Sequence, residues 1–146
     1  MINSFSANLM VADVPKSIGF YVDVIGASIA FTVDGEKNFL NEAVIDNTIF
    51  GSVRVGETEL MLQERKNLIA DAPAVFSDKD TPGGSLSLYF RVDNVDEVAE
   101  RIASATPEIE VVKPMDLTWY GMKEIWIKDP DGYVVTVGTP EGPPPS

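Results

Sequence analysis

The sequence contains neither cysteine nor histidine among its 146 residues. Without cysteine, the chain has no disulfide, no thiolate nucleophile and no zinc–thiolate site. Without histidine, it lacks the side chain that most often exchanges protons near neutral pH and most often binds metals. Catalysis by Ser-His-Asp or Cys-His groups is therefore excluded. Of the usual metal sites, only one made of carboxylates stays open.

Basic residues are also few. Eleven Lys and Arg stand against 23 Asp and Glu, which gives a net charge of −12. Nucleic acid is not an expected partner, because phosphate binding needs clustered Lys and Arg. The acidic balance is compatible with a cationic small ligand.

Segments that would target the chain to a membrane are absent from the sequence as well. No apolar run reaches the roughly 18–20 residues of a membrane helix. The N-terminus, from Met1 to Ser4, has neither the basic nor the apolar part of a signal peptide. We therefore expect no membrane partner and a cytoplasmic location.

The residues that are present, 45% of them hydrophobic, can form a core. In the first half, a predicted strand over Phe5–Val11 leads into a helix that Asp13 caps and Gly26 ends. Further strand-like stretches follow at Ser28–Val33, at Glu42–Ile49, and in a hairpin of Gly51–Val55 with Thr58–Gln63.

The second half repeats this order. Ser85–Val92 alternates apolar and polar residues, as a half-buried strand does. Asp93 or Asn94 can cap a second helix. Strand-like pieces follow at Glu110–Lys113, Lys123–Lys128 and Tyr133–Gly138.

This organisation predicts an α+β fold with one domain over residues 1–138. The domain consists of two modules, at about 5–64 and 85–138, and a connector at 65–84 joins them. The connector contains a short helical piece near Asn67–Asp71. Residues 139–146 form a Pro-rich tail.

Three stretches carry a resemblance to a known family. They are Leu9–Gly26, Gly121–Glu124 and Asp129–Tyr133, which reads Asp-Pro-Asp-Gly-Tyr. Together they resemble the glyoxalase/bleomycin resistance/dioxygenase family, the vicinal oxygen chelate superfamily, over about residues 5–138. The resemblance implies two βαβββ modules whose curved mixed sheets surround a cavity. It also implies a homodimer, often one in which the two chains exchange a module.

Metal-dependent members of this family hold their metal with His or Glu at four strand positions. The resemblance places these positions at Ser6, Met61, Ser87 and Thr136. If the register of the second position differs, Glu59 or Glu64 points inward there instead. A set of Ser, Met, Ser and Thr offers no anionic or imidazole ligand. The sequence therefore resembles the metal-free branch of the family, with no cofactor.

Loss of the metal leaves a cavity with neutral and aromatic walls. The candidate ligand-binding residues are Phe39, Phe50, Met61, Tyr89, Trp119, Tyr120 and Trp126. The alternative is that these side chains form the core, and we favour it for Trp126, which lies within an alternating strand. Trp119 and Tyr120 are expected on a loop, where ligand contact has even odds.

Four carboxylates lie near this predicted cavity. We expect them to be surface or strand-edge charges, and the alternative is a single buried general base with a raised pKa. The four are Glu42, Glu59, Glu64 and Glu124.

Three functions follow from these patterns. The favoured one is metal-free binding of a small aromatic or cationic compound, such as an antibiotic that the protein sequesters. The alternative is a lyase, isomerase or other enzyme of the same superfamily that works without the usual metal. The third is an accessory role with an empty cavity.

The first prediction concerns the metal. Elemental analysis of the purified protein should show no stoichiometric Zn, Mn, Ni or Fe, because the four family positions offer no suitable ligands. A stoichiometric metal that survives dialysis would contradict the metal-free interpretation.

Overall fold

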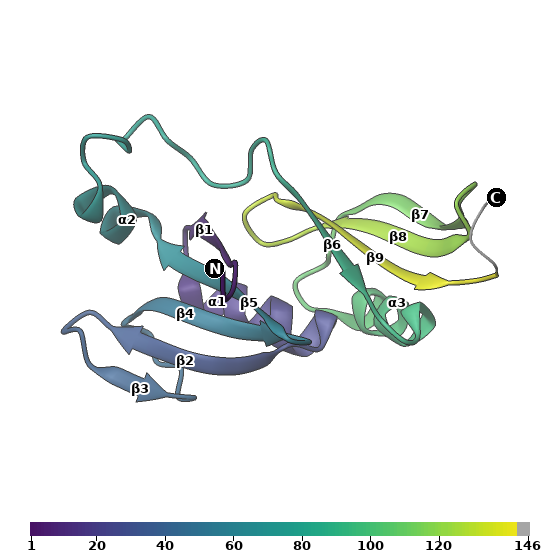
Figure 1. Ribbon diagram of the computed structural model, residues 1–146, viewed down its shortest axis with the longest axis horizontal. Coiled ribbons are helices and arrows are strands. Elements are labelled where there is room, and N and C mark those ends of the chain that lie inside the picture. Colours follow the sequence, from purple (N-terminus) through teal and green to yellow (C-terminus); the bar gives the residue numbers. More distant parts are fainter. Residues whose placement is uncertain (143–146) are drawn as a thin grey trace. The chain divides into compact units, whose positions relative to one another are not determined.

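The structure, a computed structural model, describes residues 1–142. Contacts within the chain divide it into two compact units, Met1–Gly84 and Ser85–Ser146 (Figure 1). Each unit contains one mixed sheet, of five strands in the first unit and four in the second. The α+β class is confirmed, and each unit has the predicted order of a strand, a helix and further strands.

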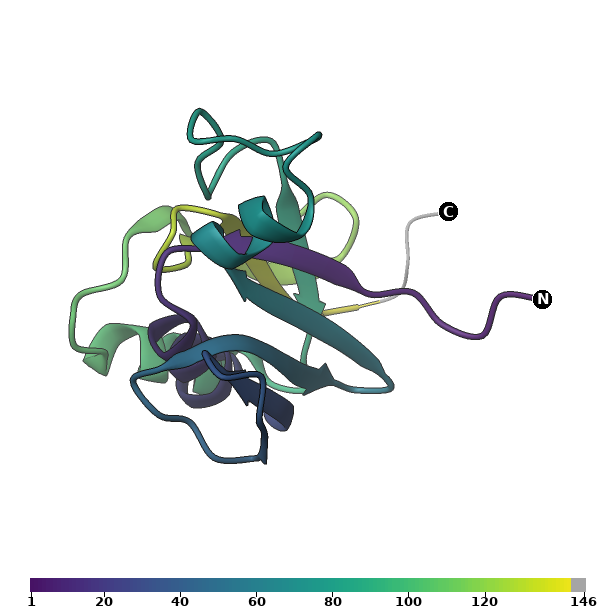
Figure 2. The same ribbon diagram turned by 90° about the vertical axis from the view of Figure 1, so that its left-hand side faces the viewer.

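The first unit contains the elements β1 to β5 with three helical segments. Its sheet has the order β1-β5-β4-β2-β3, in which β1 and β5 are parallel. The residues before β1 extend away from these strands (Figure 2). The bounds are β1 Ala7–Val11, α1 Val14–Gly19, the π-helical η1 Phe20–Ile25, β2 Ser28–Asp34, β3 Phe39–Asn41, β4 Thr48–Val55, β5 Thr58–Glu64 and α2 Arg65–Asp71.

Local sequence signals explain the helix of the first unit. The Asp13 carboxylate accepts the backbone N–H of Lys16 at 3.0 Å, so Asp13 caps α1 as predicted. Gly26 ends η1 in the left-handed conformation with φ of 99°, which glycine adopts without strain. The helix packs on β4 and β5, and their shared core contains Val11, Val14, Tyr21, Val53 and Leu62.

The second unit repeats this plan with one strand fewer. Its sheet has the order β6-β9-β8-β7, and helix α3 packs against β8 and β9. Asn94, rather than Asp93, caps α3 by accepting the N–H of Asp96 at 3.0 Å. The bounds are β6 Ser87–Arg91, α3 Val95–Ser104, β7 Val111–Leu117, β8 Met122–Lys128 and β9 Val134–Pro140.

The predicted strand over Glu42–Ile49 is wrong. The short strand β3 ends at Asn41 and β4 begins at Thr48, and a turn lies between them. In this turn, Thr48 donates its N–H to the Ile45 carbonyl at 2.9 Å, and its hydroxyl accepts the Ile45 N–H at 3.0 Å. Two local hydrogen bonds thus form a turn in place of the strand pairing that the apolar residues suggested.

The strands β7 and β9 both end later than predicted. β7 continues past Pro114, which an edge strand tolerates because no ladder hydrogen bond is required of the missing N–H. β9 continues through Thr139 to Pro140, so the first two residues of the predicted tail belong to the sheet. The end of that tail, residues 143–146, lies outside the described residues.

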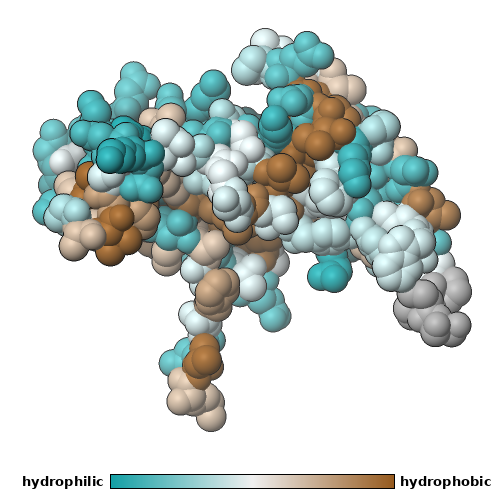
Figure 3. All heavy atoms as spheres, turned by 90° about the horizontal axis from the view of Figure 1, so that it is seen from above, coloured by the Kyte–Doolittle hydropathy of each residue, from teal (hydrophilic) through white to brown (hydrophobic). Residues whose placement is uncertain are grey.

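The sheet of the second unit has a face that α3 does not cover. This face carries Tyr89, Thr136 and Trp126, which are neighbours across β6, β9 and β8. On the surface drawn in Figure 3, hydrophobic side chains lie in several separate areas among hydrophilic ones. Within residues 1–142, no helix is long and apolar enough to cross a membrane.

The second prediction tests the cap of α1. Replacing Asp13 by Ala should lower the free energy of unfolding by about 1 kcal/mol, because the first helical turn loses an acceptor for its N–H groups. Urea unfolding at neutral pH measures the change. Asp13→Asn is the control, since Asn caps a helix about as well as Asp. Equal loss in both variants would show that the carboxylate stabilises the fold by something other than capping.

Candidate ligand-binding site

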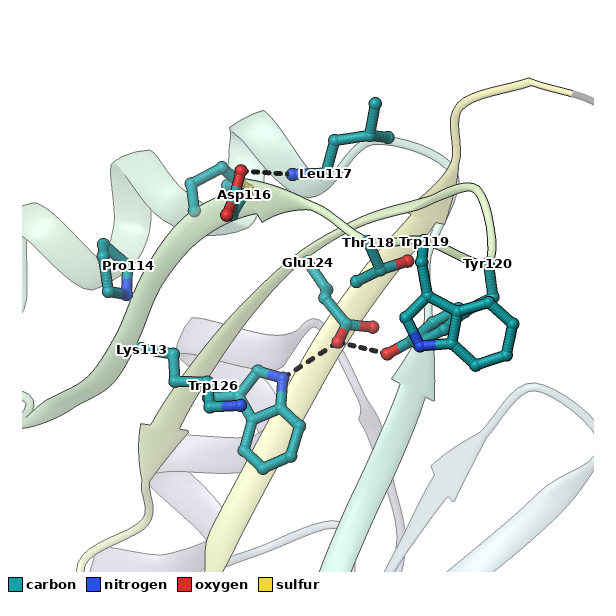
Figure 4. A pocket seen from close by; sticks show the side chains of 10 residues that line it. Lys113, Pro114, Asp116, Leu117, Thr118, Trp119, Tyr120, Glu124 and Trp126 are labelled. Carbon is teal, nitrogen blue, oxygen red and sulfur yellow. Dashed lines mark hydrogen bonds between the residues drawn. The ribbon is translucent and has the colours of Figure 1, made fainter.

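The second unit contains a pocket of about 560 Å³ on the hairpin of β7 and β8 (Figure 4). Two strands and the turn between them supply all of its walls. The lining residues are Lys113, Pro114, Met115, Asp116, Leu117, Thr118, Trp119, Tyr120, Glu124 and Trp126. Three of these ten are large aromatic residues, so the pocket has flat apolar walls with a few charges.

A tight turn places two of the aromatic rings. Thr118 donates its N–H to the Met122 carbonyl at 2.7 Å, and Gly121 donates to the Thr118 carbonyl at 3.1 Å. Trp119 and Tyr120 lie at the tip of this turn, as predicted from the sequence. Their rings meet edge to face with centroids 5.2 Å apart, and Trp119 is 85% exposed. The indole face of Trp119 is therefore accessible to a ligand.

The Glu124 carboxylate is the most deeply buried charge of the pocket, with 5% exposure. One oxygen, Oε1, accepts the Tyr120 hydroxyl at 2.5 Å and the Trp126 indole N–H at 3.0 Å. The other, Oε2, accepts the Tyr89 hydroxyl at 2.8 Å. Figure 4 shows the first two of these bonds, which fix the Tyr120 and Trp126 side chains on either side of the carboxylate.

These hydrogen bonds determine the charge state of Glu124. Burial alone would raise the pKa of its carboxyl. The three donors favour the charged form and outweigh burial, and the ammonium of Lys113 acts in the same direction. The pKa of Glu124 therefore lies below its ordinary value of 4.5, and the carboxylate is charged at neutral pH.

The pKa values of the Tyr89 and Tyr120 hydroxyls shift in the opposite direction, upward. Burial raises the pKa of the Tyr89 hydroxyl, and its hydrogen bond to Glu124 raises that pKa further. For Tyr120, the bond to Glu124 is the main cause of a raised pKa. Both hydroxyls thus stay protonated and act as donors to the carboxylate.

Gly138 makes the contact between Tyr89 and Glu124 sterically feasible. The strand β9 lies between β6 and β8, so the Tyr89 side chain must cross it. A Cβ atom on Gly138 would lie 2.6 Å from the Tyr89 hydroxyl oxygen and 3.4 Å from Cβ of Glu124. A glycine at this position leaves the space through which the hydroxyl reaches the carboxylate.

Lys113 supplies the positive charge of the pocket. It pairs with Trp126 across the β7–β8 ladder, and its ammonium nitrogen lies 4.2 Å from the centroid of a Trp126 ring. A shift of register between Lys113 and Asp116 lets Asp116 face Glu124 in the same ladder. The irregular strand β7 thus places a cation beside the indole and makes Asp116 the ladder partner of Glu124.

The predicted ligand-binding residues fall into two groups. Tyr89, Trp119, Tyr120 and Trp126 lie in the second unit around Glu124 or along the pocket. The others belong to the first unit, in which Phe39 and Phe50 each contact Phe31, with centroids 5.7 and 5.8 Å apart, and Met61 pairs with Asn8. The seven predicted residues therefore belong to two different units, and the pocket described above includes only residues of the second.

Trp126 is not a core residue, contrary to the interpretation that we favoured. Its side chain is half-buried and lines the pocket, and its indole N–H is bound to Glu124. The predicted alternation of this strand between two faces is present, but Trp126 lies on the face opposite to the core. Ile125 and Ile127 are the residues that face the core, and Trp126 points to the other face.

The side chains at the four family metal positions do not fit a divalent metal. Thr136 is buried, Ser6 and Met61 are half-buried, and Ser87 is exposed. Neutral hydroxyl and thioether groups bind such ions weakly. In the part of the chain that the structure describes, no three Asp or Glu side chains are grouped so that they could hold a metal ion.

Two residues of the site were not predicted correctly, since Glu124 was placed wrongly and Lys113 was not among the candidates. Glu124 was expected at the surface or at a strand edge, and this is wrong, because it is buried and bound by three donors. The signal was its place two residues before Trp126 on the same face of β8. Lys113 gave no such signal, since only the register of β7 places it over Trp126. Of the other predicted acids, Glu42 is exposed, and Glu59 and Glu64 are half-buried.

The third prediction follows from the pKa of Glu124. Its folded-state pKa lies below the unfolded value, so the unfolded state binds more protons in acid, and stability there rises with pH. The contribution is complete above about pH 4.5 and is lost as the pH falls through the folded value. Glu124→Gln should cost about 1–3 kcal/mol at pH 7, because hydrogen bonds to a charge are lost.

Urea unfolding between pH 7 and pH 3 tests this prediction. The gap in unfolding free energy between the wild type and Glu124→Gln should narrow as the pH falls. Glu108→Gln, which changes an exposed carboxyl before β7, is the control. A gap that stays constant with pH would mean that the charge of Glu124 does not stabilise the fold.

Comparison with known structures supports the architecture. A glyoxalase/bleomycin resistance/dioxygenase superfamily member from Sphaerobacter thermophilus DSM 20745 aligns with a TM-score of 0.65 and 21% identity, over 95% of this chain and 98% of the other. A family enzyme from Burkholderia phytofirmans PsJN aligns with a TM-score of 0.68 and 20% identity, over 92% and 95%. TioX from Micromonospora sp. ML1 aligns with a TM-score of 0.64 and 14% identity, over 94% and 98%.

These identities are low enough that the likeness shows the fold alone. No curated protein sequence matches the chain. The model of the Glyoxalase/Bleomycin resistance protein/Dioxygenase superfamily, in contrast, matches residues 2–137, which is nearly the whole sequence. The fold and this match agree with the motifs noted above, and the chain belongs to the glyoxalase/bleomycin resistance protein/dioxygenase superfamily.

Proposed function

We propose that this protein binds a small aromatic or cationic compound in the pocket of its second unit, without a metal. The observation that carries the proposal is the arrangement of Trp119, Tyr120 and Trp126 around the buried, charged Glu124. Aromatic faces stack on planar ligands and attract cations, with about 0.5–2 kcal/mol for each good contact. The pocket volume of about 560 Å³ suits a ligand of drug size.

The pocket is also preorganised for binding. Hydrogen bonds to Glu124 hold two of the three rings, so a ligand need not order them on binding. Sequestration of an antibiotic is a function that fits such a pocket in a family named in part for bleomycin resistance. The homodimer that the sequence suggested stays a prediction within this proposal.

The alternative, an enzyme that uses the pocket without a metal, has less support. A general base works best with a pKa near the working pH. The pKa of Glu124 lies below its ordinary range, and its oxygens already accept three hydrogen bonds. Glu124 is thus a weak base with restricted access. Turnover of a substrate that is abolished by Glu124→Gln would favour the enzyme over the binding protein.

The fourth prediction tests the binding function. In a thermal-shift assay with bleomycin, mitomycin C and a panel of planar aromatic amines, at least one compound should raise the melting temperature. At a ligand concentration of 100 times Kd, the native state gains about 2.7 kcal/mol. Trp119→Ala should weaken binding of that compound about 2- to 30-fold, because one stacking face is removed.

Trp119→Phe is the matched control for this experiment. It keeps an aromatic ring at the tip of the turn, and it should retain most of the affinity. Trp119 is largely exposed, so neither variant should disturb the core. The proposal fails if no compound of the panel binds, or if Trp119→Ala binds as tightly as the wild type.

A further inference from the structure

The pocket already holds a cation of its own. The Lys113 ammonium lies 4.2 Å from the centroid of a Trp126 ring, and the same indole donates its N–H to Glu124. Figure 4 shows Lys113 beside Trp126, with Glu124 on the far side of the indole N–H. The negative face of the indole ring attracts the ammonium, and its positive N–H edge attracts the carboxylate. The two contacts therefore favour each other.

The Lys113 side chain can leave this place at little cost. It is exposed, it extends from the edge strand β7, and its stem has four rotatable bonds. A cation–π contact at an exposed site is weak, and water solvates the released ammonium well. The face of Trp126 is therefore covered by a group that a ligand can displace.

Displacement of Lys113 changes the charge of the pocket. Among the ten described residues that line it, Lys113 is the one cation, and Asp116 and Glu124 are the two anions. When the ammonium moves into solvent, the Glu124 carboxylate loses a positive charge that favours its ionised form, and the pocket is left with excess negative charge. A neutral ligand stacked on Trp126 leaves the pocket with its excess negative charge. An anionic ligand increases this excess, and a cationic ligand removes it.

We propose that Lys113 is an internal, displaceable cation of this site, and that the ligand is a planar aromatic cation which takes its place on Trp126. This inference rests on the binding function proposed above and narrows its ligand to one chemical class. Lys113 then acts as a specificity-determining residue that moderates the preference for a cation set by Glu124. It covers the indole in the free protein, and only a ligand that brings its own positive charge compensates fully for its departure.

The fifth prediction uses two small probes of similar size. N-methylquinolinium is a planar aromatic cation, and 4-methylquinoline is its uncharged counterpart at pH 8. Calorimetric titration should give tighter binding of the cation to the wild type. In Lys113→Met, the preference for the cation over the neutral probe should rise about threefold or more. Both probes must displace the ammonium, but only the cationic probe is still repelled by it afterwards.

Lys128→Met is the matched control. Lys128 lies on β8, outside the pocket, and pairs with Glu110, so this variant removes the same charge from the same sheet. Its preference for the cation should equal that of the wild type. Equal gains in both variants would assign the effect to overall charge and would overturn the role of Lys113.

A second measurement does not depend on a variant. In NMR spectra of the wild type, the protons next to the Lys113 ammonium should be shifted upfield by the indole ring. They should return to ordinary positions as N-methylquinolinium is added. A Lys113 signal that stays in place at saturation, or a preference unchanged in Lys113→Met, overturns this inference while the binding function stands. Failure of both probes to bind any of the proteins overturns this inference together with the proposed binding of planar aromatic compounds.

Discussion

The second unit depends on one buried charge. A carboxylate with 5% exposure is destabilising unless donors replace the lost water. Glu124 receives these donors from three separate places: β6 through Tyr89, the β7–β8 turn through Tyr120, and its own strand through Trp126. The order of the strands, the shape of the turn and the glycine at position 138 all have to suit this one group.

This requirement also shapes the proposed ligand-binding surface. A carboxylate has about four positions at which it accepts hydrogen bonds, and three are used within the protein. The donors use their polar edges, so Tyr120 and Trp126 keep their ring faces for other contacts. The charge that holds the rings in place thus also sets the electrostatic preference of the space between them, so the proposed ligand recognition and the stability of the unit depend on the same group.

Much of the fold was predictable because its signals are local. The caps Asp13 and Asn94 and the stop at Gly26 each involve contacts within a few residues. The turn before Thr48 was missed because its local hydrogen bonds, one of them to the Thr48 hydroxyl, outweighed an apolar pattern. The burial of Glu124 was not predictable in this way, since it depends on Tyr89 reaching across β9.

The position of Lys113 also could not be predicted from local sequence signals. Strand alternation assigns a face to a residue only while the ladder is regular. Between Lys113 and Asp116 the register shifts, so three steps on β7 match two steps from Trp126 to Glu124 on β8. The extra residue brings a cation and an anion to bear on the same pocket.

A comparison of Glu124 with the family metal positions explains what this charge can do. Thr136, the fourth of these positions, pairs with both Tyr89 and Trp126, yet its hydroxyl carries no charge. The nearby charge is on the adjacent strand, at Glu124, and side-chain donors rather than further carboxylates surround it. In a chain without His or Cys, a divalent metal needs several free oxygen ligands, whereas an ammonium or aromatic cation needs one charge and flat faces. The arrangement in this protein meets the second requirement, which favours recognition of a ligand over coordination of a metal.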